Sequence, residues 1–175
     1  MGTRIMSEAS YSFMGEGRDD WSGMAMASAG DMDRDGLPDL TIGAMGHSTT
    51  DKEMVGRAYL FYAQNTAPGS HDLADADHIF EGAQAWDGAG YRTMGAGDLN
   101  GDGHVDFLAS RGHGVGLLWF KGPDFQPIEI DPKNVGPHSL VLQDLDGDGD
   151  LDVIHNNLVA DHNADFPGFG GRWAG

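Results

Sequence analysis

The sequence predicts an all-β protein made of repeated blades, each a sheet of four antiparallel strands. Glycine accounts for 28 of the 175 residues, which favours turns over long helices. A shift of the chain by 67 residues also brings one segment into ungapped register with another. Helical periodicity is weak throughout, which argues against long helices. From the repeat we expect about three blades, forming a partial β-propeller or one completed by further chains.

The repeat is defined by Phe, Gly and Asp residues that recur at the same positions. The matching pairs include Phe13 and Phe80, Gly15 and Gly82, Asp20 and Asp87, Gly30 and Gly97, and Asp31 and Asp98. A third copy starts its acidic loop at Asp144 but lacks the Phe-x-Gly segment that precedes the other two loops. The predicted organisation is an N-terminal tail at 1–10, repeat 1 at 11–83, repeat 2 at 84–131, repeat 3 at 132–160 and a C-terminal tail at 161–175.

Each copy predicts strands on both sides of its acidic loop. The apolar, β-branched and aromatic residues of these segments, together with the turn residues around them, are typical of strands. Four strands in about 45–65 residues is the size of a propeller blade. The stretch 65–76 is expected to be a loop. The predicted strands are 24–29, 40–44, 58–62 and 78–81 in the first copy, 91–96, 107–110, 115–120 and 125–130 in the second, and 139–143 and 153–155 in the third.

Three aspartate-rich loops with one spacing are the candidate metal sites. Oxygen-bearing side chains stand at loop positions 1, 3, 5 and 9, and glycine stands at position 6, where the chain must turn around an ion. Calcium takes about six to eight oxygen ligands, a number that these side chains and the carbonyl of position 7 supply. The expected ligands are Asp31, Asp33, Asp35, Leu37 and Asp39 in the first loop, Asp98, Asn100, Asp102, His104 and Asp106 in the second, and Asp144, Asp146, Asp148, Asp150 and Asp152 in the third.

Other interpretations of these loops fit less well. Asp-Gly pairs also form plain turns, but three loops with the same ligand spacing favour metal binding. An EF-hand needs a Glu at position 12, where this chain has Ile42, Ala109 and His155. Zinc favours His or Cys ligands, and magnesium a stricter octahedron. The second loop carries Asn100 in place of an Asp and is expected to be the weakest site.

The order of these motifs resembles a known repeat. Phe-x-Gly, then Gly-Asp-x-(Asp/Asn)-x-Asp-Gly-x-x-Asp, then an apolar strand, is similar to the FG-GAP repeat of integrin α-subunit propellers. The third copy, with Gly136-Pro137-His138 before its loop, is closer to the VCBS repeat. The resemblance implies about three calcium ions that hold neighbouring strands together. A departure is the family's Gly-Ala-Pro, which appears as Gly43-Ala44-Met45 in the first copy and is missing from the second.

The composition excludes several classes of function. A net charge of -18, from 28 acidic and 10 basic residues, disfavours a nucleic-acid partner. The chain has no cysteine, so it has neither disulfides nor thiolate chemistry. No apolar run is long enough to span a bilayer, and residues 1–12 lack the apolar core of a secretion signal.

Few residues suggest catalysis, and we expect a protein that is not an enzyme. No nucleophile elbow, phosphate-binding loop or zinc motif occurs in the sequence. His155 and His162 with Asp161 form either a second metal site or, as favoured here, ordinary polar positions. Trp21 and Trp86 lie in turns and suit either a sugar-binding face or the turns themselves, whereas Trp119 is expected in the core.

The resemblance and the loops together predict a calcium-binding blade protein for extracellular adhesion or ligand recognition. Its expected partner is a protein or glycan ligand. The alternatives are part of a polysaccharide-active enzyme and a structural subunit of a larger assembly. The chain is either a piece of a larger propeller or one member of a homo-oligomeric ring. In such a ring, the strand at 11–14, which matches the fourth strand of a preceding blade, would complete the final blade of a second copy.

Overall fold

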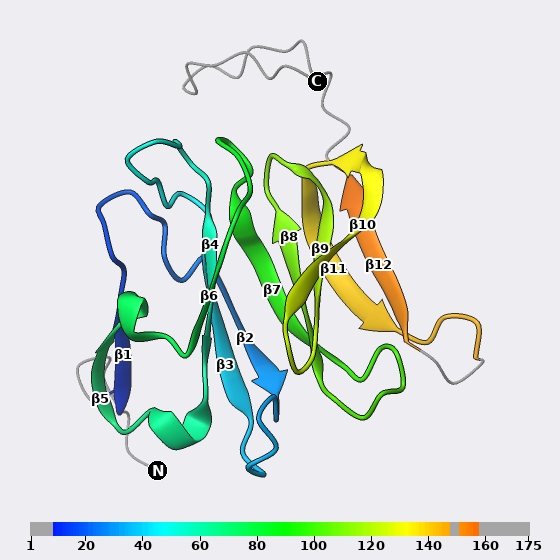
Figure 1. Ribbon diagram of the computed structural model, residues 1–175, viewed down its shortest axis with the longest axis horizontal. Helices are drawn as coiled ribbons and strands as arrows, with labels where there is room; N and C mark the ends of the chain where they lie inside the picture. The colour runs from blue at the N-terminus through cyan, green and yellow to red at the C-terminus, as the bar shows by residue number, and fades with distance from the viewer. Residues whose placement is uncertain (1–8, 148–150, 158–175) are drawn as a thin grey trace, which may run out of the picture.

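The computed structural model describes residues 9–147 and 151–157, which form strands and two single-turn 3₁₀ helices. We call the sheet of β2, β3, β4 and β6 the first blade, the sheet of β7, β8, β9 and β10 the second blade, and the pair of β11 and β12 the third unit. Figure 1 shows these units side by side. The first blade contains β2 (Ala25–Gly30), β3 (Asp39–Ala44), β4 (Arg57–Phe61) and β6 (His78–Glu81), and the second contains β7 (Ala89–Gly97), β8 (Asp106–Arg111), β9 (Val115–Lys121) and β10 (Gln126–Val135).

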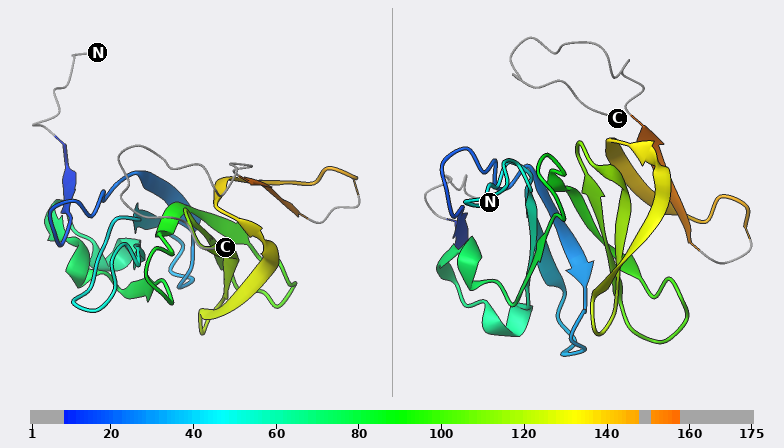
Figure 2. Two further views of the ribbon diagram at one scale, coloured as in Figure 1. Left: turned by 90° about the horizontal axis from the view of Figure 1, so that it is seen from above. Right: turned by 45° about the horizontal axis from the view of Figure 1, so that its top comes forward.

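The remaining elements lie at the two ends of this row. The third unit consists of β11 (Pro137–Gln143) and β12 (Asp152–Asn157), paired antiparallel. At the other end, β1 (Tyr11–Met14) pairs in parallel with β5 (Gly69–Asp72), next to η3 (Leu73–Asp75); η2 (Ala63–Asn65) follows β4. Seen from above in Figure 2, the units follow one another from β1 and β5 to β12, and the described sheets do not close into a ring.

A β-bulge lies directly before each of the first two acidic loops. In the first blade the register of β2 and β3 shifts between Ser28 and Gly30, and in the second that of β7 and β8 shifts between Gly95 and Gly97. Gly30 and Gly97 have φ angles of 81° and 65°, in the region that favours glycine. The glycine of each Gly-Asp pair thus re-aims the chain into its loop.

The main hydrophobic core lies between the two blades. Leu60 and Phe107 are both fully buried there, and Phe80 of β6 packs its ring against Phe107 and Phe120, with centroids 5.2 and 4.4 Å apart. Beside this core, the hydroxyl oxygens of Thr41 in the first blade and Thr93 in the second lie 3.0 Å apart. The outer strand of the first blade therefore helps to cover the second, and the two blades share one core.

The all-β prediction is confirmed, with sheets of four antiparallel strands as expected of propeller blades. One local prediction is wrong: the stretch 65–76 is not a plain loop, because it contains β5 and η3. Its largely polar sequence carries few strand signals, and Leu73 alone supplies a buried apolar side chain. The strand at 11–14 exists as β1 and pairs in parallel with β5; its pairing with a second copy stays a prediction.

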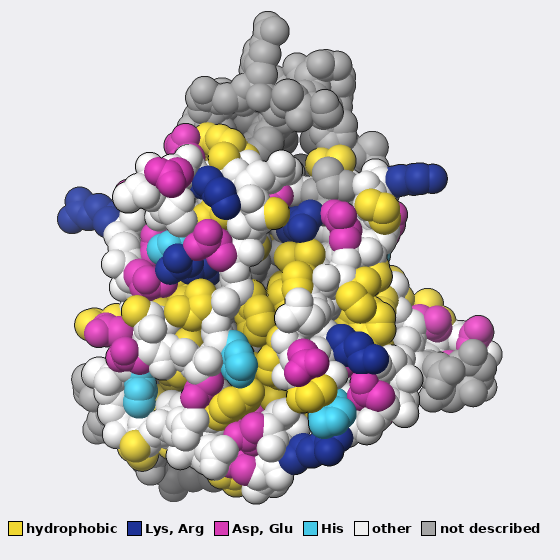
Figure 3. Space-filling model, viewed as in Figure 1, with side chains coloured by type: hydrophobic (Ala, Val, Ile, Leu, Met, Phe, Trp, Pro, Cys, Tyr) yellow, Lys and Arg dark blue, Asp and Glu magenta, His cyan; other side chains and the backbone are white. Residues whose placement is uncertain are grey.

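Within the described part of the chain, no helix has the length and apolar character needed to cross a membrane. Figure 3 shows Asp and Glu side chains spread over the whole visible face rather than gathered in one patch.

Candidate metal centres

The three acidic loops occupy equivalent places, each joining the first two strands of its unit. The first loop (31–39) connects β2 to β3, the second (98–106) connects β7 to β8, and the third (144–152) connects β11 to β12. In Figure 1 the first two lie at the lower end of the blades and the third at the lower right. Asp148 and Asp150 of the third loop lie outside the described residues.

The first loop brings three of its predicted ligands together. Asp31, Asp33 and Asp39 each offer a carboxylate oxygen within 4.8 Å of the other two. Asp31 Oδ2 accepts a hydrogen bond from the Gly36 N–H at 3.0 Å, whereas its Oδ1 is buried and accepts none. A buried carboxylate oxygen without a donor is costly unless a cation faces it.

Asp35 and Leu37 lie in the same loop but outside this group of three. Asp35 Oδ1 accepts a hydrogen bond from the Leu37 N–H at 2.7 Å, and the Asp35 N–H donates to Asp33 Oδ1 at 3.1 Å. These short-range bonds wrap the backbone around the loop in the way that Asp side chains stabilise turns. Asp35 therefore stabilises the turn through local hydrogen bonds. That it also coordinates a metal ion stays a prediction.

The carboxylate at position 9 fixes each of the first two loops through hydrogen bonds to the backbone. Asp39 is 2% exposed and Asp106 is fully buried. Asp39 Oδ2 accepts from the Met32 N–H at 2.7 Å and its Oδ1 from the Ala63 N–H at 2.8 Å. Asp106 does the same with the N–H groups of Leu99 (3.1 Å) and Gly122 (2.9 Å). Each carboxylate therefore ties the start of its loop to the end of the third strand.

The electrostatics of the first loop favour a cation. Burial raises the pKa of Asp39 above its usual value, and the nearby Asp33 and Asp35 carboxylates raise it further, against the lowering effect of the two N–H donors. Like charges at this spacing repel one another in a partly desolvated site. A bound divalent cation would relieve that repulsion.

Positive φ angles occur at two positions of the loop, of which the sequence predicts only one. Position 6 is Gly36 in the first loop and Gly103 in the second, with φ of 90° and 85°. Position 4 is also left-handed, and there the first loop has Arg34, with φ of 66°. The Arg34 guanidinium donates to the Gly103 carbonyl of the second loop, and a non-glycine residue in this conformation is uncommon.

The second loop departs from the other two. Three carboxylates also come together within 4.8 Å in the third loop, at Asp144, Asp146 and Asp152, but among the described residues those of Asp98, Asp102 and Asp106 do not. Asp102 instead accepts from Asn100 Nδ2 at 3.0 Å and pairs with Lys121 Nζ at 3.2 Å. The His104 N–H, Asn100 and Lys121 together lower the pKa of Asp102 to about 2.

The ion pair of Lys121 with Asp102 is a further reason to expect that the second loop is the weakest metal site. Lys121 is not part of the loop motif. It belongs to β9 and reaches the loop only after folding. Gln64 is a second residue that the motif misses, since its Nε2 donates to Asp33 Oδ2 from the segment after β4. No signal within the nine-residue loops points to either side chain.

The donor set fits a hard cation. The first and third loops offer carboxylate oxygens and no nitrogen or sulfur ligand among the grouped residues, which suits calcium and disfavours zinc. Of the other candidates, His155 lies in β12 and pairs with Asp131 at 3.0 Å, while His162 and Asp161 fall outside the described residues. Trp119 lies in β9 and is half-buried, and Trp21, in the turn before β2, is 39% exposed.

The sheets and their strand-to-strand loops define a repeat protein built of propeller-type blades. Residues 98–155 match the model of the FG-GAP-like repeat. The chain is 30% identical over 159 residues to phosphatidylinositol-glycan-specific phospholipase D of Rattus norvegicus, covering 79% of this chain and 18% of that protein. It is 30% identical over 132 residues to integrin alpha-PS2 of Drosophila melanogaster, covering 70% of this chain and 9% of that protein.

These similarities identify the chain as an FG-GAP repeat protein with integrin-like β-propeller blades. The matched segment begins at the first residue of the second loop and includes the third, so two of the three acidic loops belong to the recognised repeat. The chain spans less than a fifth of the length of either relative.

Proposed function

We propose that this protein binds calcium through its acidic loops and that the ions serve to stabilise the blades. The observation that carries the proposal is the group of Asp31, Asp33 and Asp39 in the first loop, in which Asp31 Oδ1 is buried without a hydrogen-bond donor. Asp144, Asp146 and Asp152 repeat the group in the third loop. The second loop, with Asn100 and Lys121, is proposed as the site of lowest affinity.

Calcium would contribute positive charge where the folded chain gathers carboxylates. In the unfolded chain these carboxylates move apart, so the ion binds the folded state in preference and stabilises it by mass action. The hydrogen bonds of Asp39 and Asp106 already shape their loops, so the ion would complete a site that is largely formed. The proposed role is structural, and the protein is proposed not to be an enzyme.

Calcium is expected to raise the melting temperature. At a free concentration a hundred times the dissociation constant, one site adds about 2.7 kcal/mol, or about 5–10 °C for a chain of this size. Differential scanning fluorimetry in calcium, in magnesium and in excess chelator measures the effect. Asp31→Asn should remove the contribution of the first loop, whereas Asp51→Asn, an exposed charge outside the loops, should leave it unchanged. Equal melting temperatures in calcium and in chelator would refute calcium binding.

We further propose that the blades act outside the cell, in adhesion or in recognition of a protein or glycan ligand. Support comes from the similarity to a protein named integrin alpha-PS2 and from loops suited to the calcium levels of extracellular modules. The similarity to a protein named a phospholipase D makes an enzymatic role the alternative to exclude. A glycan array and a hydrolase and lyase screen, each with and without calcium, separate the two. Binding without turnover is expected, and calcium-dependent turnover would overturn the assignment.

A further inference from the structure

One face of the first blade packs on the second blade, and the opposite face is covered by the start of the chain and the 65–76 stretch. We call β1, β5 and η3 together the end cap. Phe13 and Leu73 of the end cap pack on Ile42, Tyr59 and Phe61 of the first blade, and Leu73 is only 1% exposed. Alternation along β4 produces the two faces, because Leu60 points to the second blade while Tyr59 and Phe61 point to the end cap.

The end cap meets the first blade as the first blade meets the second. Phe13 and Phe80 are equivalent in the repeat, and Phe61 and Phe120 are equivalent because they pair with the matching residues Leu40 and Phe107. The Phe13 ring contacts Phe61 at a centroid distance of 4.9 Å, and the Phe80 ring contacts Phe120 at 4.4 Å. Strand β1 therefore packs on the first blade as β6, the outer strand of one blade, packs on the next.

Beside β1, the segment between β4 and β6, which contains β5 and η3, takes the place of the other strands of a neighbouring blade. Strand β5 supplies a parallel partner for β1, with Ser12 opposite Ser70 and their hydroxyl oxygens 2.8 Å apart. The pair is extended by a hydrogen bond of 2.9 Å from the Gly69 N–H to the Ser10 carbonyl. Phe13 also stacks on His71, with ring centroids 5.4 Å apart.

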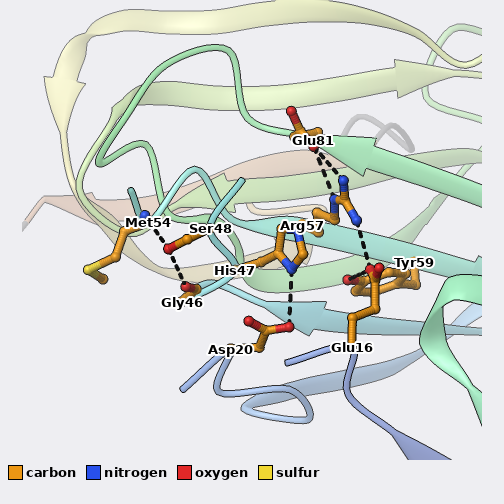
Figure 4. Close-up of polar contacts among 9 residues, drawn as sticks. All are labelled: Glu16, Asp20, Gly46, His47, Ser48, Met54, Arg57, Tyr59 and Glu81. Carbon is orange, nitrogen blue, oxygen red and sulfur yellow. Dashed lines mark hydrogen bonds and ion pairs between the residues drawn. The ribbon is translucent and has the colours of Figure 1, made fainter. Parts of the chain in front are cut away.

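Polar side-chain contacts hold the connection between β1 and β2 on the same blade (Figure 4). Glu16 Oε1 accepts from the Tyr59 hydroxyl at 2.6 Å and from Arg57 Nη1 at 2.8 Å. Burial raises the pKa of Glu16, but these two donors outweigh it and keep the pKa below its usual value. Four residues further on, Asp20 Oδ2 lies 3.1 Å from His47 Nδ1, and both side chains are buried. The segment that leads out of β1 is thus fixed at two points.

The outer side of the end cap is polar along β5 and η3, whereas Tyr11 and Met14 at the two ends of β1 are 47% and 58% exposed. Asp72 and Asp75 are exposed there, as is Ser70, while Leu73 between them is buried. The polar residues of β5 and η3 give this part of the surface the character of terminal repeats in stacked proteins, whose polar outer faces prevent further stacking. Carboxylates at this surface would disfavour an apolar partner.

We propose that the end cap is a built-in substitute for a neighbouring blade, which closes the free face of the first blade to a second copy of this chain. With the end cap seated, Ile42, Tyr59 and Phe61 are covered and cannot contact a blade of a second copy. This role is independent of calcium, because no residue of the end cap belongs to an acidic loop.

A disulfide lock tests whether the end cap stays seated. The chain has no cysteine, so Ser12→Cys with Ser70→Cys creates a single possible intrachain bond between paired strands. We expect complete intrachain oxidation and a molar mass by light scattering equal to that of the wild type. Failure to form the bond, or a locked protein whose assembly differs from that of the wild type, would show that the end cap leaves the blade and would overturn the proposal.

A charge introduced under the end cap tests the face that it covers. Phe13→Asp should unseat β1, uncover the apolar face and cause about a doubling of the weight-average molar mass as copies associate. Met14→Asp is the matched control, since Met14 is the next residue and is 58% exposed. Equal molar masses for the two variants and the wild type would contradict the proposal. If Phe13→Asp does not fold, as judged by circular dichroism, the disulfide lock decides.

Discussion

Asp106→Ala is expected to destabilise the protein by about 3–5 kcal/mol, with or without calcium, because a buried acceptor of two backbone hydrogen bonds disappears. Asp106 is fully buried, and its two oxygens accept from the Leu99 and Gly122 N–H groups at 3.1 and 2.9 Å. Alanine leaves both donors without a partner and also leaves a small cavity. The tie between the acidic loop and the end of β9 is lost.

Urea unfolding in calcium and in excess chelator measures this effect and separates it from metal binding. Asn100→Ala is a suitable control, since Asn100 is an exposed member of the same loop whose contacts stay within the loop. Its effect should be below about 1 kcal/mol in chelator. If Asp106→Ala were costly in calcium and nearly neutral in chelator, position 9 would act only as a metal ligand, and its role as a hydrogen-bonded tie would be wrong.

The features that sequence predicts well are those written in short, repeated patterns. The strands on both sides of each acidic loop follow from apolar alternation next to Gly and Asp, and they lie within a residue or two of their predicted bounds. The recurrence of Gly30 and Gly97 before the first two loops is also visible in the sequence, and the structure places a bulge and a positive φ angle there. Local chemistry decides both features, so a single chain is enough to reveal them.

The features that sequence misses depend on residues distant along the chain. Lys121 neutralises Asp102 from the third strand of the blade, and Ala63 donates to Asp39 across 24 residues. The end cap is a further case, because β5 has no apolar alternation. It forms by pairing with the edge of β1, and the adjacent Leu73 is buried against the first blade. Such contacts follow from the arrangement of blades, which the loop motif does not contain.

Gly43→Ala is expected to destabilise the protein by about 3 kcal/mol or more, because the two blades approach each other at this glycine. A Cβ atom at Gly43 would lie 1.9 Å from the Gly90 carbonyl oxygen, a backbone atom that cannot move alone. In the second copy of the repeat the equivalent position is Ser110, whose Oγ accepts from the Arg92 N–H at 3.0 Å. The glycine that the second copy lacks therefore stands, in the first copy, where the first blade packs closely on the second.

Thermal unfolding in the presence of calcium checks this prediction, with a decrease in melting temperature of about 6–12 °C expected for a chain of this length. Gly101→Ala is the control, because Gly101 has a φ of 72° and a Cβ atom added there would meet no atom within 4 Å, so only its backbone conformation is disturbed. That cost is about 1–2 kcal/mol. A Gly43→Ala protein at least as stable as Gly101→Ala would mean that the blades are not in close contact at β3 and β7. The shared core between them would then be looser than the packing of Phe80 on Phe107 implies.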